Sequence, residues 1–382
     1  MSSVPDRVHV AAAPAAASRG QAAEVAAAAP PAVAAKRRPM LAYLHAFRAV
    51  AILFIVLGHC VRLFDWAPVP RVELFLLDLL ENGTVLFVFI AGYLFEYLSD
   101  RYEYRSYLTT KLRNVIVPYL IISVPALVHD VLLNDPVAIW PQLAGTSWPY
   151  QVGWFLLKGG AGLNFPMWFI PMIALYYLAA PLFMQFVRRP ALYWLLPVLV
   201  VVSLLIHRPA HDRLDTLHQA AYYFSAYVAG MAISHFRDRI EPLLQRLWVP
   251  LSLLTCAMIL AQWRWSPFHG NYQGVAPFSM EHGLIDWLFL QKLVMCLALV
   301  GFMRRWYVQR IKLVDLVADL SFPVFFLHAY FIFGATLLFG SVPAGSILGF
   351  VALAGGVFSL SVATVVLLKG MLGSSSRWVL GA

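Results

Sequence analysis

The fold is decided by one stretch of sequence, Arg48-Ala-Val-Ala-Ile-Leu-Phe-Ile-Val-Leu-Gly-His59. It is an apolar run with an arginine at one end and a histidine at the other. An α-helix turns about 100° per residue, so eleven steps bring the chain within about 20° of three full turns. The side chains of Arg48 and His59 are therefore predicted to lie on one face of one helix, about 16 Å apart along its axis.

The uncharged run that contains His59 is short for a membrane span. Only thirteen residues separate Arg48 from Arg62, whereas a spanning helix needs about 20 apolar residues. At least one ionisable group must therefore lie at membrane depth, where such groups face protein or water and are usually functional. We expect Arg48 and His59 to line one water-filled passage. The alternative is that His59 is a packed core histidine and that Arg48 extends to the membrane surface.

The composition is that of a membrane protein. Of 382 residues, 61% are hydrophobic and 12% are charged, with a mean hydropathy of +0.73, and a soluble domain carries about 25% charged residues. Because spanning segments must pair their backbone groups internally, the fold class is an all-α bundle of transmembrane helices. We predict about ten of them, at roughly 41–63, 73–98, 111–133, 166–187, 191–206, 216–235, 247–264, 283–303, 314–338 and 344–368.

Lysine and arginine are distributed asymmetrically between the two sides of this bundle. With the N-terminus placed in the cytosol, the inner connections and flanks carry eighteen of them and the outer connections carry six. This bias predicts that both termini are cytosolic. Most of the net charge of +9 then reflects orientation in the bilayer, so nucleic acid is not an expected partner.

The chain is predicted to divide into three parts. Residues 1–39 are rich in Ala and Pro and are interpreted as a disordered cytosolic tail. Residues 40–370 form the transmembrane domain, and residues 371–382 form a short cytosolic tail. The three cysteines lie in apolar stretches without metal-ligand spacing, so we expect neither a disulfide nor a metal site.

The outer connections 134–165 and 265–282 are rich in aromatic residues. Such residues form a belt at the membrane–water interface in many membrane proteins. The same residues could instead form a platform for a sugar. The inner connections 101–113 and 304–312 are basic, and this either sets the orientation alone or also attracts the phosphates of a polyanionic cytosolic ligand.

Five motifs occur in an order that resembles the acyltransferase-3 family of integral membrane acyltransferases. They are Arg48 and His59 at their spacing of eleven, Phe87-Val-Phe-Ile-Ala-Gly-Tyr93, Lys111-Leu-Arg-Asn-Val-Ile-Val-Pro-Tyr119, Trp168-Phe-Ile-Pro171 and Ser321-Phe-Pro-Val-Phe-Phe-Leu-His328. The resemblance covers about residues 40–368. The chain departs from the family pattern at Ala91, where serine is usual, at Asn114, where a second arginine is common, and at Phe326, where tyrosine is usual.

The resemblance implies transfer of an acyl group, usually acetyl from acetyl-CoA, to a hydroxyl of an extracytoplasmic glycan such as an exopolysaccharide. His59 would be the catalytic base, because an imidazole titrates near neutrality. Arg48 would position the donor through forked hydrogen bonds, assisted by Lys111 and Arg113 at the cytosolic mouth.

The acceptor side of this predicted site involves two further residues. His328 is expected at a depth comparable to that of His59, where it either lines the same cavity or is a packed histidine. Trp168 is expected to contact the acceptor. No metal is expected. The resemblance places the protein in the bacterial inner membrane, with acetyl-CoA, the glycan, the lipid bilayer and the machinery of polysaccharide synthesis as partners.

Two other function classes remain open at this stage. In a transporter or flippase, His59 and Arg48 would form a proton or anion relay. In a non-catalytic scaffold of a polysaccharide-synthesis complex, neither side chain would be needed for chemistry. Loss of glycan acylation on substitution of His59 or Arg48 separates the enzyme from both alternatives.

Overall fold

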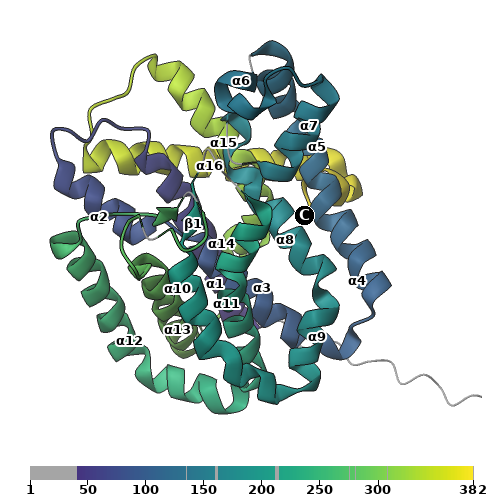
Figure 1. Cartoon of the computed structure of the whole chain (residues 1–382), viewed down its shortest axis with the longest axis vertical. Helices are drawn as coiled ribbons and strands as arrows, with labels where there is room; N and C mark the ends of the chain where they lie inside the picture. Colours follow the sequence, from purple (N-terminus) through teal and green to yellow (C-terminus); the bar gives the residue numbers. More distant parts are fainter. Residues whose placement is uncertain are drawn as a thin grey trace, which may run out of the picture. The chain divides into compact units, whose positions relative to one another are not determined.

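The computed structural model describes residues 41–134, 136–159, 162–210, 215–274, 276–279, 281–307 and 309–381. The predicted N-terminal tail, residues 1–39, lies outside this part of the chain. The described part is a bundle of helices (Figure 1). Its only named strands are β1 (Arg208–Pro209) and β2 (Gln273–Gly274), which pair in parallel.

The helices follow the predicted apolar segments, and several segments are broken into two. The α-helices are α1 (Ala42–Val61), α2 (Pro70–Leu80), α3 (Thr84–Tyr97), α4 (Tyr104–Lys111), α5 (Val117–Leu127), α6 (Pro136–Ile139), α7 (Trp148–Lys158), α8 (Phe169–Leu178), α9 (Ala180–Arg188), α10 (Leu196–Ile206), α11 (Thr216–His235), α12 (Arg237–Trp265), α13 (Trp287–Trp306), α14 (Lys312–Asp319), α15 (Ser321–Phe339), α16 (Ile347–Leu372) and α17 (Ser376–Leu380). A π-helical turn, Leu112–Ile116, joins α4 to α5, and a second one, Val128–Leu133, follows α5.

The number of spanning helices among the described residues is lower than the predicted ten. Seven helices are long and apolar enough to cross a membrane, and the pair formed by α8 and α9, bent by 54°, would make eight. The segment Pro190–Ile206 is apolar but shorter, and α11 carries many polar and tyrosine side chains. The count of ten and the cytosolic position of the termini stay predictions.

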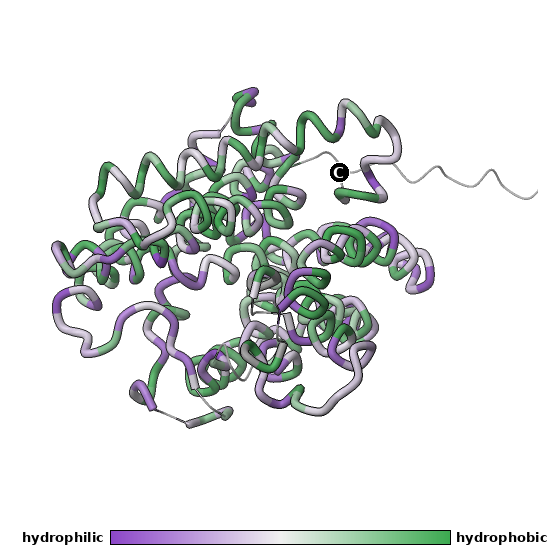
Figure 2. Tube along the Cα trace, turned by 90° about the horizontal axis from the view of Figure 1, so that it is seen from above, coloured by the Kyte–Doolittle hydropathy of each residue, from purple (hydrophilic) through white to green (hydrophobic). Residues whose placement is uncertain are grey.

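Apolar side chains on the outside of the bundle fit a lipid environment. Leu338 and Leu348, at the facing ends of α15 and α16, are more than 80% exposed, and α10 and α12 also expose leucine and valine. Figure 2 shows apolar residues dominating the helices, with hydrophilic residues mainly at helix ends and in connections. A soluble protein rarely exposes so many large apolar side chains in continuous rows, so this is a multi-pass membrane protein.

Two glycines allow α3 and α11 to cross in close contact. A Cβ atom at Gly92 would lie 1.9 Å from the carbonyl oxygen of Tyr227, and one at Gly230 would lie 2.0 Å from that of Phe89. Neither position admits a larger residue without moving backbone. Small residues at helix interfaces are the usual way to bring membrane helices together, which explains the glycine in the second family-like motif.

Helix α1 lies at the centre of the arrangement that forms the site. It packs against α2, α3, α13, α14, α15 and α16. Phe47, Ala51, Ile52 and Val56 on α1 are completely buried. A helix that is apolar on all sides is buried in a bundle. Among the polar side chains of α1, Arg48 and His59 line cavities enclosed by neighbouring helices.

The predicted C-terminal tail, residues 371–382, is folded in its described part. Helix α16 ends at Leu372, and α17 packs against α5. Leu380 is only 1% exposed. The structured domain therefore continues past the boundary predicted at residue 370, because an apolar turn containing Val379 and Leu380 provides a face to bury.

Candidate active site

Arg48 lies in a large cavity at one end of α1. The cavity has a volume of about 650 Å³ and is bounded by side chains from α1, α3, α4, α8, α11 and the turn after α4. The Arg48 guanidinium Nη2 donates a hydrogen bond of 3.0 Å to Ser321 Oγ. Ser321 Oγ in turn donates to the carbonyl of Ala318 at 2.8 Å. Ser321 therefore fixes the direction of Arg48.

Lys111 lines the same cavity, whereas Arg113 does not. The Lys111 ammonium lies 5.3 Å from the ring centre of Tyr107 and 5.0 Å from that of Tyr177, so it is held by two aromatic rings. Arg113 is exposed, and its guanidinium lies 4.2 Å from the ring centre of Trp378 in α17. Two residues of this turn line the cavity: Asn114, where the family often has arginine, and Val115.

His59 lies in a second, smaller cavity of about 270 Å³. Polar side chains are well represented in its lining, and they come from α1, the turn between α2 and α3, and two loops far along the sequence. They are His59, Arg62, Glu81, Asn82, Thr84, Arg208 and Asn271, and Trp168 lies beside them. His59 is half-buried. An imidazole in this position can reach a ligand in the cavity, while its buried side is held by the surrounding protein.

His59 and His328 lie against each other. Their rings are stacked, with centroids 5.3 Å apart and an angle of 23° between the ring planes. His328 is completely buried, and its Nδ1 lies 2.7 Å from the carbonyl oxygen of Phe325. Because a carbonyl only accepts hydrogen bonds, this contact assigns the hydrogen of a neutral ring to Nδ1. His328 does not belong to the lining of either described cavity. Its contact with the site is the stacking of its ring on that of His59.

Trp168 borders the His59 cavity but is only 5% exposed. The Arg208 guanidinium lies 4.8 Å from its ring centre, and the Tyr223 ring stacks on it at 5.8 Å with an interplanar angle of 19°. A sugar could not stack on this ring without displacing one of these groups. The role of Trp168 in acceptor binding stays a prediction, and its observed role is to hold Arg208.

The two cavities share no lining residue in the described part of the chain. Trp168 lines the smaller cavity and its neighbour Phe169 the larger one, and Thr84 and Phe87, one turn apart on α3, are divided in the same way. The sequence predicted that Arg48 and His59 line one passage. Among the described residues, Arg48 and His59 instead line two separate cavities.

A sequence model of the acyltransferase domain matches residues 41–366. The chain belongs to the acyltransferase-3 family. No curated protein and no solved structure matches it with significant similarity. As a member of this family with apolar helices long enough to cross a bilayer, the protein is a membrane acyltransferase. The matched region includes every described residue that lines the His59 cavity, and every one that lines the Arg48 cavity except Gly381.

This acyltransferase also contains cavity residues that motif comparison did not identify. Arg62 donates to Glu81 Oε1, and the backbone NH of Asn271 donates to Glu81 Oε2 at 2.8 Å. The available signal was the polar triplet Glu81-Asn82-Gly83 inside the apolar segment 73–98. The helix is interrupted there, between α2 and α3, and Asn82 adopts a positive φ of 57°.

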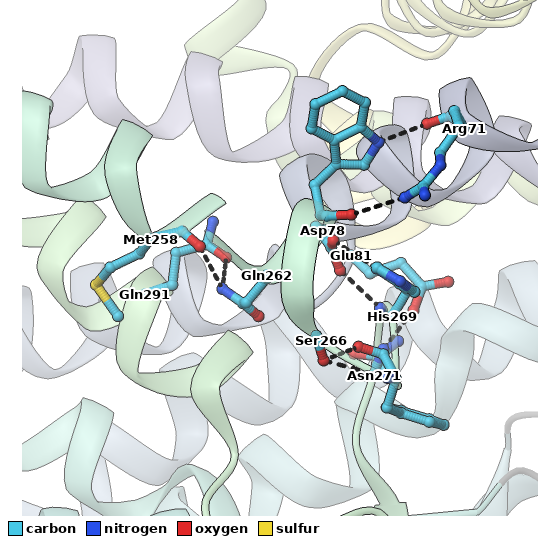
Figure 3. Close-up of polar contacts among 12 residues, drawn as sticks. Arg71, Asp78, Glu81, Met258, Gln262, Ser266, His269, Asn271 and Gln291 are labelled. Carbon is cyan, nitrogen blue, oxygen red and sulfur yellow. Dashed lines mark hydrogen bonds and ion pairs between the residues drawn. The ribbon is translucent and has the colours of Figure 1, made fainter. Parts of the chain in front are cut away.

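Carboxylates at the end of α2 attach the loop before α13 to the site of the acyltransferase (Figure 3). His269 Nδ1 lies 2.8 Å from Asp78 Oδ2, and the NH of Gly270 donates to Asp78 Oδ1 at 3.1 Å. Lys292, completely buried on α13, donates to the carbonyls of Asp78 and Leu79. The loop that supplies Asn271 is therefore fixed to the helix that precedes Glu81.

Proposed function

We propose that this membrane acyltransferase transfers an acetyl group from acetyl-CoA, bound in the Arg48 cavity, to a hydroxyl of an extracytoplasmic glycan, bound in the His59 cavity. The observation that carries the proposal is that one helix presents a guanidinium to one cavity and an imidazole to another. About 16 Å of helix axis separates them. A donor and an acceptor in different compartments require such an arrangement.

The charge distribution supports this orientation. The positive-inside bias predicts that the end of α1 carrying Arg48 faces the cytosol, where acetyl-CoA is found. The lining of the Arg48 cavity includes Arg101 and Lys111, with Glu103 as its one acidic side chain among the described residues. Arginine and lysine near one another attract phosphates. A volume of about 650 Å³ is within the range of cofactor sites.

In the proposed reaction, His59 removes the proton from the acceptor hydroxyl as its oxygen attacks the acetyl carbonyl carbon. A C–O ester bond forms, the thioester C–S bond breaks, and the leaving thiolate of CoA takes a proton. Arg48 holds the donor. Because Arg48 and His59 line different cavities, the acetyl group passes from one to the other either within the donor or as an acyl group on His59. Both routes require His59.

The test is transfer of label from radioactive acetyl-CoA by the purified full chain in nanodiscs, together with mass analysis of surface glycan from cells. His59→Ala is expected to lower kcat by about 10²–10⁴-fold, the usual contribution of a general base. Arg48→Ala is expected to raise KM for acetyl-CoA. His282→Ala and Arg189→Ala are matched controls, since neither side chain lines either described cavity.

The outcomes separate the proposal from the two other function classes. A transporter shows no acetyl transfer in the wild-type protein. A scaffold retains normal glycan acetylation in cells that express His59→Ala and Arg48→Ala at the wild-type level, and that result would exclude the proposed function. The proposed location is the bacterial inner membrane, beside the machinery of polysaccharide synthesis.

A further inference from the structure

Arg208 is a buried cation in the lining of the His59 cavity. It is only 6% exposed. Its Nε has no hydrogen-bond partner, and its guanidinium has no ion pair among the residues that the structure describes. The guanidinium lies 4.8 Å from the ring centre of Trp168. Burying a charge is costly unless it is paired, so a guanidinium in this state indicates a missing anion.

The other charges of the cavity do not supply that anion. Glu81 is the one carboxylate that the described residues contribute to the lining, and both of its oxygens are engaged, one by Arg62 and one by the NH of Asn271. Arg62 and Glu81 neutralise each other. No negative charge among the described residues of the lining then remains to balance Arg208. The cavity therefore has an excess of positive charge when His59 is neutral.

Asp286 is a carboxyl outside the lining that interacts electrostatically with Arg208. Its Oδ2 accepts from the Tyr222 hydroxyl at 2.7 Å and its Oδ1 from the NH of Phe289 at 2.8 Å. Burial raises the pKa of Asp286 to about 7, against the lowering effect of these bonds and of Arg208. Both oxygens of Asp286 are engaged by these bonds, and no ion pair joins this carboxyl to Arg208 among the described residues.

The position of Arg208 is fixed by backbone contacts. Its NH donates to the carbonyl of Tyr272 at 2.9 Å, and the NH of Ala210 donates to that of Gly274 at 3.2 Å. These bonds form the β1–β2 pair, and the β2 loop is held by the carboxylates of Asp78 and Glu81. A rigid guanidinium binds an anion at a smaller entropic cost than a mobile one.

We propose that Arg208 binds an anionic group, a carboxylate or a phosphate, on the sugar that enters the His59 cavity, so that the acceptor is an acidic glycan. This inference rests on the proposed function. A forked pair of hydrogen bonds from a guanidinium matches both groups. A cavity of about 270 Å³ is at the small end of ligand sites, so it takes about one sugar residue rather than a length of chain.

The test is binding of four sugars to the full chain in nanodiscs, measured by titration calorimetry without acetyl-CoA. The sugars are glucuronate, its uncharged methyl ester, glucose and a glucose monophosphate. Glucuronate or the phosphate is expected to bind at least about 10-fold more tightly than the methyl ester and glucose, as a charge-assisted hydrogen bond requires. Preference for one of the two anions identifies which group the acceptor carries.

Variants then assign the preference to Arg208. Arg208→Gln is expected to reduce the ratio of acidic to neutral affinity to about one, and Arg208→Lys is expected to retain part of it. Arg71→Gln is the matched control, because Arg71 is an exposed arginine on α2 that does not line the cavity. Equal binding of all four sugars by the wild-type protein, or no binding of any of them, would overturn the inference even if Arg208→Gln does not fold.

The same measurements distinguish the inference from the proposed function. Sugar binding requires no acyl donor, whereas the proposed function fails if the wild-type protein transfers no label from acetyl-CoA. If the protein transfers acetyl groups but binds neutral and acidic sugars equally, the proposed function is supported and the inference of an acidic acceptor is rejected.

Discussion

The imidazole rings of His59 and His328 stack at 5.3 Å, although the two residues come from the first and the fifteenth α-helix. One ring reaches a cavity and the other is completely buried. The two histidines therefore differ in their access to the cavity, a difference that the family motifs do not show. We therefore expect His59 to do the chemistry of the proposed reaction and His328 to be a positioning residue that sets the ring plane of His59.

The first prediction concerns this stacking. His328→Ala removes the supporting ring and should lower kcat for acetyl transfer by about 10- to 100-fold, because a small misplacement of a catalytic group has an effect of this size. His328→Phe keeps a ring and should retain more activity. KM for acetyl-CoA should not change in either variant. If the Phe variant were as inactive as the Ala variant, His328 would have a chemical role of its own.

The second prediction concerns the fixing of Arg48 by Ser321. Ser321→Ala removes the oxygen that accepts from Arg48 at 3.0 Å. A hydrogen bond to a charged group contributes about 1.5–3 kcal/mol, so KM for acetyl-CoA should rise by about 10-fold or more. Arg48→Lys should have at least as large an effect, because an ammonium lacks the planar fork. Steady-state kinetics with varied acetyl-CoA measures both, and an unchanged KM would show that Ser321 does not position the donor site.

A third prediction follows from the contact between α3 and α11. Gly92→Ala and Gly230→Ala would each place a methyl group against a backbone carbonyl, at 1.9 and 2.0 Å. Overpacking of this kind costs about 1–3 kcal/mol, so both variants should melt at a lower temperature in nanodiscs. Gly355→Ala is the control, because a Cβ there has nothing within 4 Å. Equal melting temperatures for all three would mean that the two helices can separate freely.

The fourth prediction is a dependence of stability on pH. Burial raises the pKa of Asp286, just before α13, from 3.8 to about 7. Asp286 binds its proton more tightly in the folded state than in the unfolded state. Its contribution to stability is complete at a pH below the unfolded pKa, and it is lost as the pH rises through the folded pKa. Stability should therefore fall from about pH 4 to about pH 7, and Asp286→Asn should remove this part of the fall. A thermal melting series over this range measures it, and an identical slope in the Asn variant would contradict it.

Several features could be predicted from the sequence because they depend on local patterns. Hydropathy summed over 20 residues identifies a spanning helix without reference to its neighbours, and α1, Ala42–Val61, was predicted within two residues at each end. Helical periodicity places Arg48 and His59 on one face of α1 for the same reason. Five short motifs were sufficient to predict the family.

Helix breaks were harder to predict than helices, because they depend on packing as well as hydropathy. The segment 73–98 contains a break at Glu81-Asn82-Gly83, and the segment 166–187 is bent by 54° between α8 and α9. In the second segment the apolar run continues in the sequence while the helix axis changes. An average over 20 residues does not detect such a break.

What the sequence alone determined is the class of protein, its family and the shared helix face of Arg48 and His59, since each of these depends on residues close together in the chain. Only the tertiary structure decided that the two side chains face different cavities, that Lys111 and not Arg113 lies beside Arg48, and that Arg208 and Glu81 join His59. These groups come from segments far apart in the sequence. Their meeting depends on how α1 packs against its neighbouring helices, and no local pattern records that packing.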